Sequence, residues 1–306
     1  MVRQAGAALV VVLWVVAALS LLAASFGLGV RREARLAVNL AEAAKLRAAA
    51  EAGIQYAAFM LTQPDSERRF RADGSVYALV LDELEVRVQV VDEGGKVDLN
   101  QADEGLLRAI LTYLTQDPDR AAALASAILD WRDGDRDRRV NGAEADDYRA
   151  AGLNYEPADA PFDSVAEVGL VLGMTSELTQ ALLPLVTVYS GQAGINPYLA
   201  PKEVLLALPG MDPAFVDGFV QARSQQIAGA GGLPLPTLPG VNFHALAGAA
   251  FGMNVEVRGQ GGDFQLAAVV RPGQGVEYLD WRETKLPKSL FDLPLAAPEI
   301  KLPAPP

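Results

Sequence analysis

The chain has 306 residues, a formal net charge of −12 at pH 7, one histidine and no cysteine. An acidic chain repels phosphate backbones and anionic surfaces, so the composition argues against bulk nucleic-acid binding. Most metal-hydrolase sites and Ser/His or Cys/His triads need side chains that are missing here, so we do not expect an enzyme. We expect His244 to be structural, because no carboxylate lies at helical spacing beside it.

The N-terminal segment is a long apolar run. Residues 7–30 carry no charge and would form a helix of roughly 36 Å, enough to cross the ~30 Å hydrocarbon core of a bilayer. No proline interrupts the chain before Pro64, so we expect one helix with a membrane part over 7–30 and a stalk over 31–62. A secretory signal peptide cut near Ser25 and an ordinary single-span anchor remain alternatives. The flanking charges do not settle the orientation: they are Arg3 before the run and Arg31, Arg32 and Arg35 after it.

One face of the predicted stalk is apolar and mostly small. Its larger members, spaced three and four residues apart, are Leu36, Leu40, Ile54, Ala58 and Leu61. Such a face suits close packing against a sheet or against other helices. The members expected to contact partner helices in a bundle are Ala43, Ala50 and Ala57.

Apolar residues alternate with polar ones in two later regions. Residues 77–81 and 84–90 predict an antiparallel pair with a turn near Asp82. Residues 255–280 predict a meander of strands, and a proline-rich tail, 285–306, is expected to be extended or mobile. Strands therefore flank a helical block on both sides. We predict an α+β chain, with an all-α domain inserted into a β domain.

The helical block is strongly punctuated. Helices are expected from Asn100 to about Leu114 and from Pro118 to Asp130, and Ser164 with Glu167 forms a capping box. Residues 167–174 and 203–211 look like an internal repeat. In each copy an apolar helix ends at a glycine and a second helix starts at a polar cap, either Thr175 or Asp212.

The turn at 208–211 resembles a helix-hairpin-helix. In nucleic-acid-binding examples the hairpin amides and the second helix N-terminus meet a phosphate. Asp212 and Asp217 stand at that start here, and only Lys202 and Arg223 could support an anion. A packing module is the alternative interpretation.

The densest cluster of charged residues lies between Asp130 and Tyr148. With Asp133 as the first position, acids stand at positions 1, 3 and 5, and Glu144 stands at position 12. This is the carboxylate spacing of a calcium loop. Arg138 occupies position 6, where the tight turn of an EF-hand needs glycine. Two interpretations stay open: an oxygen-rich Ca²⁺ site of another geometry, or a solvated loop whose acids are neutralised by its arginines.

With these elements in place, nearly the whole chain resembles the general secretion pathway protein K family, the large minor pseudopilins of type II secretion systems. The most specific stretches are Lys96-Val-Asp-Leu-Asn100, Asp130-Trp-Arg-Asp-Gly-Asp135, Asn141-Gly-Ala-Glu144 with Tyr148, Pro161-Phe-Asp-Ser-Val-Ala-Glu167, Leu172-Gly-Met174, Leu183-Pro-Leu-Val-Thr-Val188 and Gly194-Ile-Asn196. The resemblance implies a pilin-like fold with a long N-terminal helix and an antiparallel sheet. The implied parts are a leader (1–6), a membrane segment (7–30), a stalk (31–62), a first β part (63–97), an inserted α domain (98–240), a second β part (241–284) and the tail (285–306).

The resemblance also implies processing and topology. A prepilin peptidase would cut after Gly6 and methylate the new amino group of Ala7. The protein would span the bacterial inner membrane once, with a cytoplasmic N-terminus and a periplasmic head. A structural Ca²⁺ would bind in the acidic loop. The implied ligands are Asp133, Asp135, Glu144 and Asp147, and the further candidates are Asp130, Asp137 and Asn141.

Val11 would be the fifth residue of the mature chain. Most pilin-like subunits carry a glutamate there, which pairs with the terminal amine of a neighbour. A buried carboxylate without that partner costs several kcal/mol, so an apolar residue suits a subunit with nothing above it.

The function that follows is structural. The chain would cap the tip of a type II secretion pseudopilus and help to initiate its assembly for export of folded proteins across the outer membrane. Its partners would be the I- and J-type minor pseudopilins, then the H-type, together with the prepilin peptidase and the inner-membrane platform. Alternatives are a tip pilin of a type IV pilus and a membrane-tethered DNA receptor, and the acidity of the chain argues against the latter.

Overall fold

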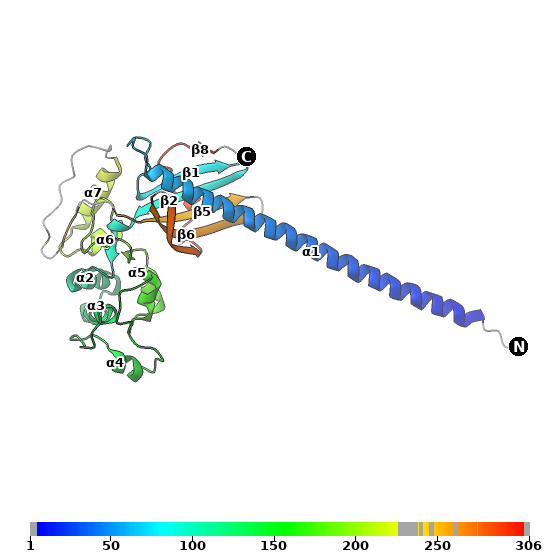
Figure 1. Ribbon diagram of the computed structural model, residues 1–306, viewed down its shortest axis with the longest axis horizontal. Helices are drawn as coiled ribbons and strands as arrows, with labels where there is room; N and C mark the ends of the chain where they lie inside the picture. The colour runs from blue at the N-terminus through cyan, green and yellow to red at the C-terminus, as the bar shows by residue number, and fades with distance from the viewer. Residues whose placement is uncertain are drawn as a thin grey trace.

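The computed structural model describes residues 5–225, 238, 241–244, 248–259, 262–273 and 275–302. Its longest element is helix α1, Ala5–Leu61. The N-terminal part of α1 projects away from the rest of the molecule, while its C-terminal part lies on a sheet (Figure 1). One helix therefore runs through both the predicted membrane part and the predicted stalk, as the sequence indicates.

Within the described residues the main sheet has six strands in the order β7-β6-β5-β2-β1-β8. All neighbours pair antiparallel except β1 and β8, which are parallel. The predicted hairpin and the predicted meander are both confirmed. The strands are β1 (Asp73–Leu81), β2 (Leu84–Asp92), β5 (Phe251–Gly259), β6 (Gly262–Pro272), β7 (Val276–Glu283) and β8 (Ile300–Lys301).

The C-terminal half of α1 packs tightly against one face of this sheet. Ala50, Ile54 and Ala57 are completely buried there. A Cβ added to Gly53 would lie 2.9 Å from Cγ1 of Val86, so the helix backbone lies directly against side chains of the sheet. The expectation that Ala50 and Ala57 contact partner helices is therefore wrong, because this chain's own sheet covers them. Ala43, like the predicted face members Leu36 and Leu40, is exposed.

The proline-rich tail is docked on the sheet rather than pendant. It forms a 3₁₀ turn, η3 (Leu290–Asp292), and the edge strand β8. The carboxylate of Glu256, which is 1% exposed, accepts hydrogen bonds from the backbone N–H of Leu290 at 2.6 Å and the hydroxyl of Ser289 at 2.9 Å. Leu290 packs on Val76. Side chains alternate along a strand, and the neighbours of Val76 in β1 face α1, so Val76 lies on the other face of the sheet. The tail therefore covers the opposite face of the sheet, and a mobile tail is not what the structure shows for residues up to 302.

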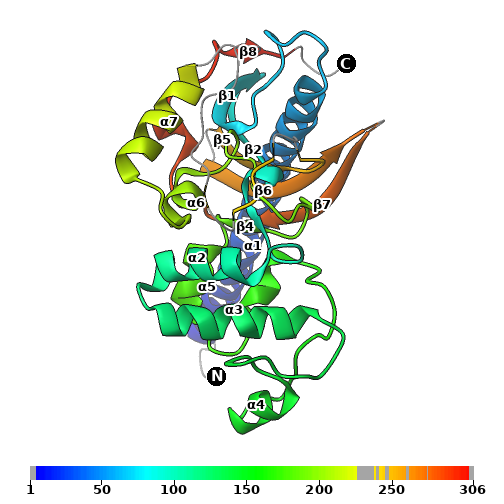
Figure 2. The same cartoon turned by 90° about the vertical axis from the view of Figure 1, so that its left-hand side faces the viewer.

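The chain between β2 and β5 forms a helical lobe beside the sheet (Figure 2). The lobe has its own hydrophobic core, separate from the core under α1. A short parallel pair, β3 (Val97–Asp98) with β4 (Val186–Thr187), lies at its start. Its helices are α2 (Glu104–Thr115), α3 (Pro118–Arg132), α4 (Ala145–Ala150), η2 (Val165–Leu170), α5 (Ser176–Leu182), α6 (Lys202–Ala207) and α7 (Pro213–Gln225).

Two local predictions in this lobe have different outcomes. The internal repeat is confirmed at its turns, where both copies place a glycine in the left-handed region, Gly173 with φ 86° and Gly210 with φ 76°, but the first copy begins with the 3₁₀ segment η2 instead of an α-helix. The predicted start of the first helix at Asn100 is wrong. Asp103 caps α2, accepting from the N–H of Leu106 at 2.8 Å, whereas Asn100 bridges to both backbone groups of Phe162.

Candidate functional site

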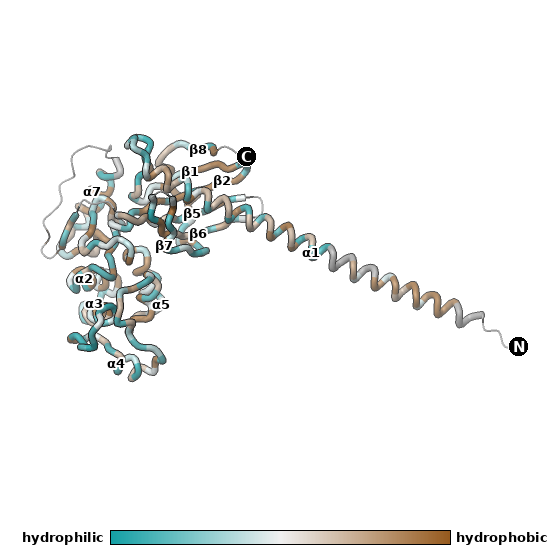
Figure 3. Tube along the Cα trace, viewed as in Figure 1, coloured by the Kyte–Doolittle hydropathy of each residue, from teal (hydrophilic) through white to brown (hydrophobic). Residues whose placement is uncertain are grey.

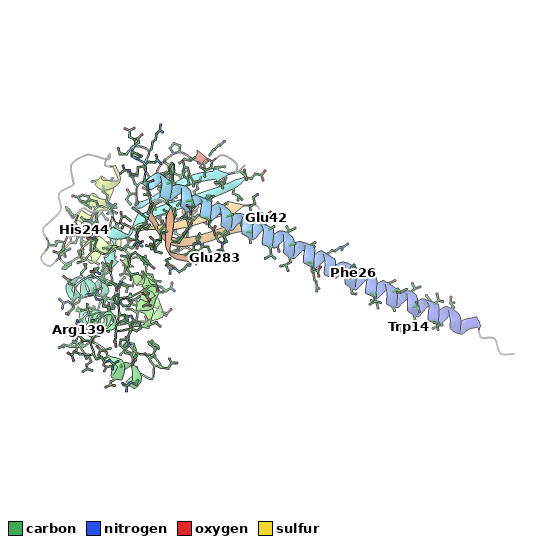
Figure 4. All side chains as sticks on the ribbon, in the orientation of Figure 1. Trp14, Phe26, Glu42, Arg139, His244 and Glu283 are labelled. Atoms are coloured by element: carbon green, nitrogen blue, oxygen red, sulfur yellow. The ribbon has the colours of Figure 1, made fainter. Side chains whose placement is uncertain are left out.

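The N-terminal part of α1 presents an exposed apolar surface, formed by the described side chains of residues 9–22 and Phe26. Hydrophobic residues line it (Figure 3), and the labelled Trp14 and Phe26 point away from the helix (Figure 4). Trp14 is 74% exposed, Phe26 76% and Val11 61%. In the part of α1 and the other helices whose side chains are described, no segment is long and apolar enough to cross a membrane. Gly6 and Ala7, the residues of the predicted cleavage site, lie outside that part. Exposed apolar surface of this extent marks an interaction site.

The acidic loop is organised around Asp130 and Arg139. Asp130, at the end of α3, is completely buried, and its Oδ1 lies 2.8 Å from Nη1 of Arg139. The same guanidinium pairs with Asp133. These two carboxylates, Asp130 first, raise the pKa of Arg139. Gly142 presses against the Asp130 carboxylate so closely that a side chain there would collide with it.

Asp147 is held by a second set of contacts. Its Oδ2 accepts the backbone N–H of Glu144 at 3.0 Å, which is one half of a capping box that starts α4. Its Oδ1 lies 2.9 Å from Nη1 of Arg138. The backbone hydrogen bond, followed by Arg138, lowers the pKa of Asp147. The carboxylates of Asp130, Asp133 and Asp147 are thus each paired with an arginine.

Glu144 has no such partner. It is 8% exposed, and its Oε1 is buried without a hydrogen bond. Burial, followed by the charges of four surrounding aspartates, raises the pKa of Glu144 to about 7; the aspartates are Asp130, Asp159, Asp133 and Asp135. Glu144 lines a hollow of about 230 Å³. A carboxylate that is buried, unpaired and surrounded by acids would gain from a cation.

The predicted calcium ligands gather here only in part. Among the described residues, no three acidic or imidazole side chains lie close enough together to hold a metal ion. Oxygen donors suit Ca²⁺, and the unpaired Glu144 oxygen fits that need, but arginines lie beside three of the other carboxylates. The remaining predicted ligands, all exposed, are Asp135, Asp137 and Asn141.

Sequence reasoning missed Asp159. It lines the same hollow as Glu144 and pairs with Arg136 at 3.8 Å. Its φ of 49° lies in the left-handed region. No spacing pattern connects it to the loop, because the segment between α4 and η2 folds back by an irregular path. An isolated aspartate before Ala160-Pro161 was the only signal.

Two other candidates have structural explanations. In the helix-hairpin-helix-like segment, Nζ of Lys202 lies 2.5 Å from Asp217 and Arg223 donates to the carbonyl of Pro197. Both basic side chains therefore already contact acceptors within this chain. His244 is held through its backbone, whose N–H donates to the carbonyl of Ile195, while its ring nitrogens are buried without a hydrogen-bond partner in the described part of the chain.

The chain is similar to known proteins over part of its length. Residues 76–191 match a family model described as type II secretion system (T2SS), protein K. Type II secretion system protein K of Klebsiella pneumoniae is 31% identical over 152 residues, 46% of this chain and 45% of that protein. The protein of the same name from Pectobacterium carotovorum subsp. carotovorum is 36% identical over 81 residues, 26% of this chain and 25% of that protein. The alignments therefore span less than half of these relatives.

A solved structure shows the same fold. It is described as the GspK-GspI-GspJ complex from the type 2 secretion system of enterotoxigenic Escherichia coli. The TM-score is 0.54 at 16% sequence identity, and the match covers 84% of this chain and 99% of that chain. The mixed helix-and-sheet architecture predicted from the sequence is therefore confirmed, and the predicted domain boundaries stay predictions.

Proposed function

We propose that the chain is a minor pseudopilin of the type II secretion system protein K family, because residues 76–191 match the model of that family. The family match is the observation that carries the proposal. It covers β1, β2 and the lobe as far as β4, the region where the sheet and the helical lobe join. The proposed role of the protein is structural, because its sequence contains no paired carboxylates and no nucleophile with a base that would support catalysis.

The N-terminal part of α1 is the proposed anchor and assembly surface. Its exposed apolar side chains would lie in the inner membrane before assembly and against neighbouring helices afterwards. The described side chains alone make too short a run to cross a bilayer, and the apolar sequence from residue 7 to 30 supplies the remaining length. Cleavage after Gly6 and methylation of Ala7 belong to the same proposal.

The proposed position is the tip of the pseudopilus, with I- and J-type minor pseudopilins as partners. Val11 is exposed on the projecting helix, and as the fifth mature residue it would offer no carboxylate to a subunit above. The helical lobe adds bulk at the end of the molecule remote from the helix N-terminus (Figure 1). Both features suit a subunit that ends the filament and helps to start its assembly for protein export.

We further propose that the acidic loop binds Ca²⁺ as a structural ion. The uncompensated Glu144 oxygen supports this proposal. Glu144 and Asp135 would be available to the ion, and Asp130, Asp133, Asp147 and Asp159 would join it if their arginines moved aside. When bound, the ion would neutralise the surplus negative charge of the loop.

The decisive experiment examines the full chain extracted from membranes of cells with and without a prepilin peptidase. We expect a mature chain that begins with N-methylated Ala7 and copurifies with I- and J-type minor pseudopilins. Substitution Val11→Glu should reduce assembly and secretion, while Val12→Ala, an apolar change on the same helix, should not. A chain that keeps Met1, or that copurifies with neither pseudopilin, would refute the proposal. Unchanged secretion in Val11→Glu, with crosslinks along the shaft, would refute the tip position alone.

A further inference from the structure

A groove of about 930 Å³ lies at the C-terminal end of α1. One wall is the last two turns of α1, the floor is the start of β1 and the loop before it, and the other wall is the docked tail at 296–300. The groove residues used below are Tyr56, Phe59, Arg68, Phe70 and Tyr77. None of them belongs to the acidic loop or to the projecting part of α1.

The floor of the groove is aromatic and held in place. The rings of Phe70 and Tyr77 stack at 3.6 Å with 5° between their planes. Tyr56 meets Phe70 edge-on at 6.2 Å, and the hydroxyl of Tyr77 accepts the N–H of Arg71 at 2.6 Å. Phe59, at the mouth of the groove, is 59% exposed. A ligand would therefore meet preformed apolar surface, at little cost in ordering side chains.

The rim of the groove is basic in an otherwise acidic chain. The guanidinium of Arg69 is tied to the carbonyl of Gln63 at 2.7 Å and so orders the loop. The side chain of Arg68 is 80% exposed, and its ion pair with Asp65 is long at 3.5 Å and exposed on both sides, so it contributes little. Glu299, the nearest acid of the opposite wall, pairs with Arg87. Counting every charged side chain of the lining, three arginines (Arg68, Arg69 and Arg71) stand against two glutamates (Glu67 and Glu299), so the groove carries a net charge of +1 in a chain of net charge −12.

The tail offers an edge of backbone to the groove. Residues 295–302 run parallel to β1, with Leu79 opposite Ile300 and the N–H of Ala296 donating to Val76. β8 ends the sheet, and within the described residues no strand lies beyond it. A sheet edge with open N–H and C=O groups is a template for another extended chain.

We propose that this groove binds an extended, acidic segment of a partner protein. The segment pairs its backbone with the outer edge of 296–301, places apolar side chains against Phe59 and the aromatic floor, and brings a carboxylate to Arg68. Aromatic walls select alternate side chains, edge pairing selects an extended backbone, and the arginine selects charge. The inference holds whether or not the chain is a pseudopilin.

The test uses the full chain in nanodiscs of zwitterionic lipid and three fluorescent, end-blocked peptides of about eight residues. One peptide alternates Glu with Leu, the second alternates Lys with Leu, and the third is the first peptide N-methylated on alternate amides to prevent edge pairing. Binding is measured by fluorescence anisotropy. The groove variants are Arg68→Glu and Phe59→Ser. Their controls are Arg108→Glu and Leu170→Ser, which change an exposed arginine and an exposed apolar residue of the helical lobe.

We expect the Glu peptide to bind the wild-type chain about tenfold more tightly than the Lys peptide does. Arg68→Glu should weaken binding of the Glu peptide about tenfold, because an attractive contact becomes repulsive. Phe59→Ser and N-methylation should also weaken binding, and the two control variants should not. Equal binding of the Glu and Lys peptides, equal losses in the controls, or full binding of the N-methylated peptide would overturn the proposal. So would vesicles of anionic lipid that bind through Arg68 and exclude the Glu peptide, since the rim would then serve a membrane surface.

Discussion

Substitution Glu144→Gln tests the charge balance of the acidic loop. Glu144 is 8% exposed and its Oε1 is unpaired. Burial raises its pKa to about 7 from an ordinary value of 4.5. Because the folded state holds the proton more tightly than the unfolded state, stability is fully present below about pH 4.5 and is lost as the pH rises through 7. Glutamine keeps the size of the side chain and removes the charge, so it should remove this loss.

The magnitude follows from the size of the shift. Each pKa unit corresponds to about 1.4 kcal/mol, so the shift from 4.5 to about 7 sets an upper bound of about 3.5 kcal/mol. The hollow beside Glu144 opens to solvent and salt screens the neighbouring acids, so we expect about 1–2 kcal/mol of local stability between pH 5 and pH 8. Hydrogen exchange of the α4 amides, measured with the full chain in EGTA, reports this local opening free energy directly. Glu156→Gln, an exposed residue lining the same hollow, is the matched control.

Calcium supplies the second arm of the same measurement. A bound ion should restore the stability of the wild-type loop at pH 8, by about 2.7 kcal/mol at a concentration of 100 times Kd. Glu144→Gln should respond less. If the pH profile of Glu144→Gln matched that of the wild type, Glu144 would not carry the uncompensated charge. If calcium stabilised both variants equally, Glu144 would not be a ligand.

Two further substitutions test the fold. Gly53→Ala should cost about 1–3 kcal/mol, because the new Cβ would lie 2.9 Å from Val86 and 3.2 Å from Val88; thermal denaturation measures the loss, and the exposed Ala48→Ser should leave the transition unchanged. Glu256→Gln should weaken the docked tail by about 2 kcal/mol, since it removes a charge-assisted acceptor of the Leu290 N–H. Trypsin should then cut after Lys288 faster than in the exposed control Glu277→Gln, and equal cleavage rates would contradict that role for Glu256.

Predictions from the sequence succeeded where local periodicity alone decides the structure. The β1–β2 hairpin follows from strict alternation, because each strand buries one face under α1. The repeat around Gly173 and Gly210 follows from the need for glycine at positive φ.

Predictions failed where a distant partner decides. Asn100 looks like a cap, but its side chain is satisfied by Phe162, 62 residues away. The prolines of the tail predict an extended or mobile segment, and the segment is extended, but its docking by the buried Glu256 could not be predicted. Asp159 joins the acidic hollow through an irregular segment that no spacing rule describes. Each failure involves a polar group whose partner lies far along the chain, which periodicity cannot indicate.

The structure also separates the two interpretations of the acidic loop residue by residue. Neutralisation by arginine accounts for Asp130 and Asp133, which share Arg139, and for Asp147, which pairs with Arg138. It does not account for Glu144, whose carboxylate is buried among these acids and has no cation of its own. A solvated loop would leave such a carboxylate in water, where its charge costs little. Because Glu144 is instead buried, its negative charge is not balanced by a cation of the loop. The calcium measurement on Glu144→Gln tests whether a metal ion or a proton neutralises this carboxylate.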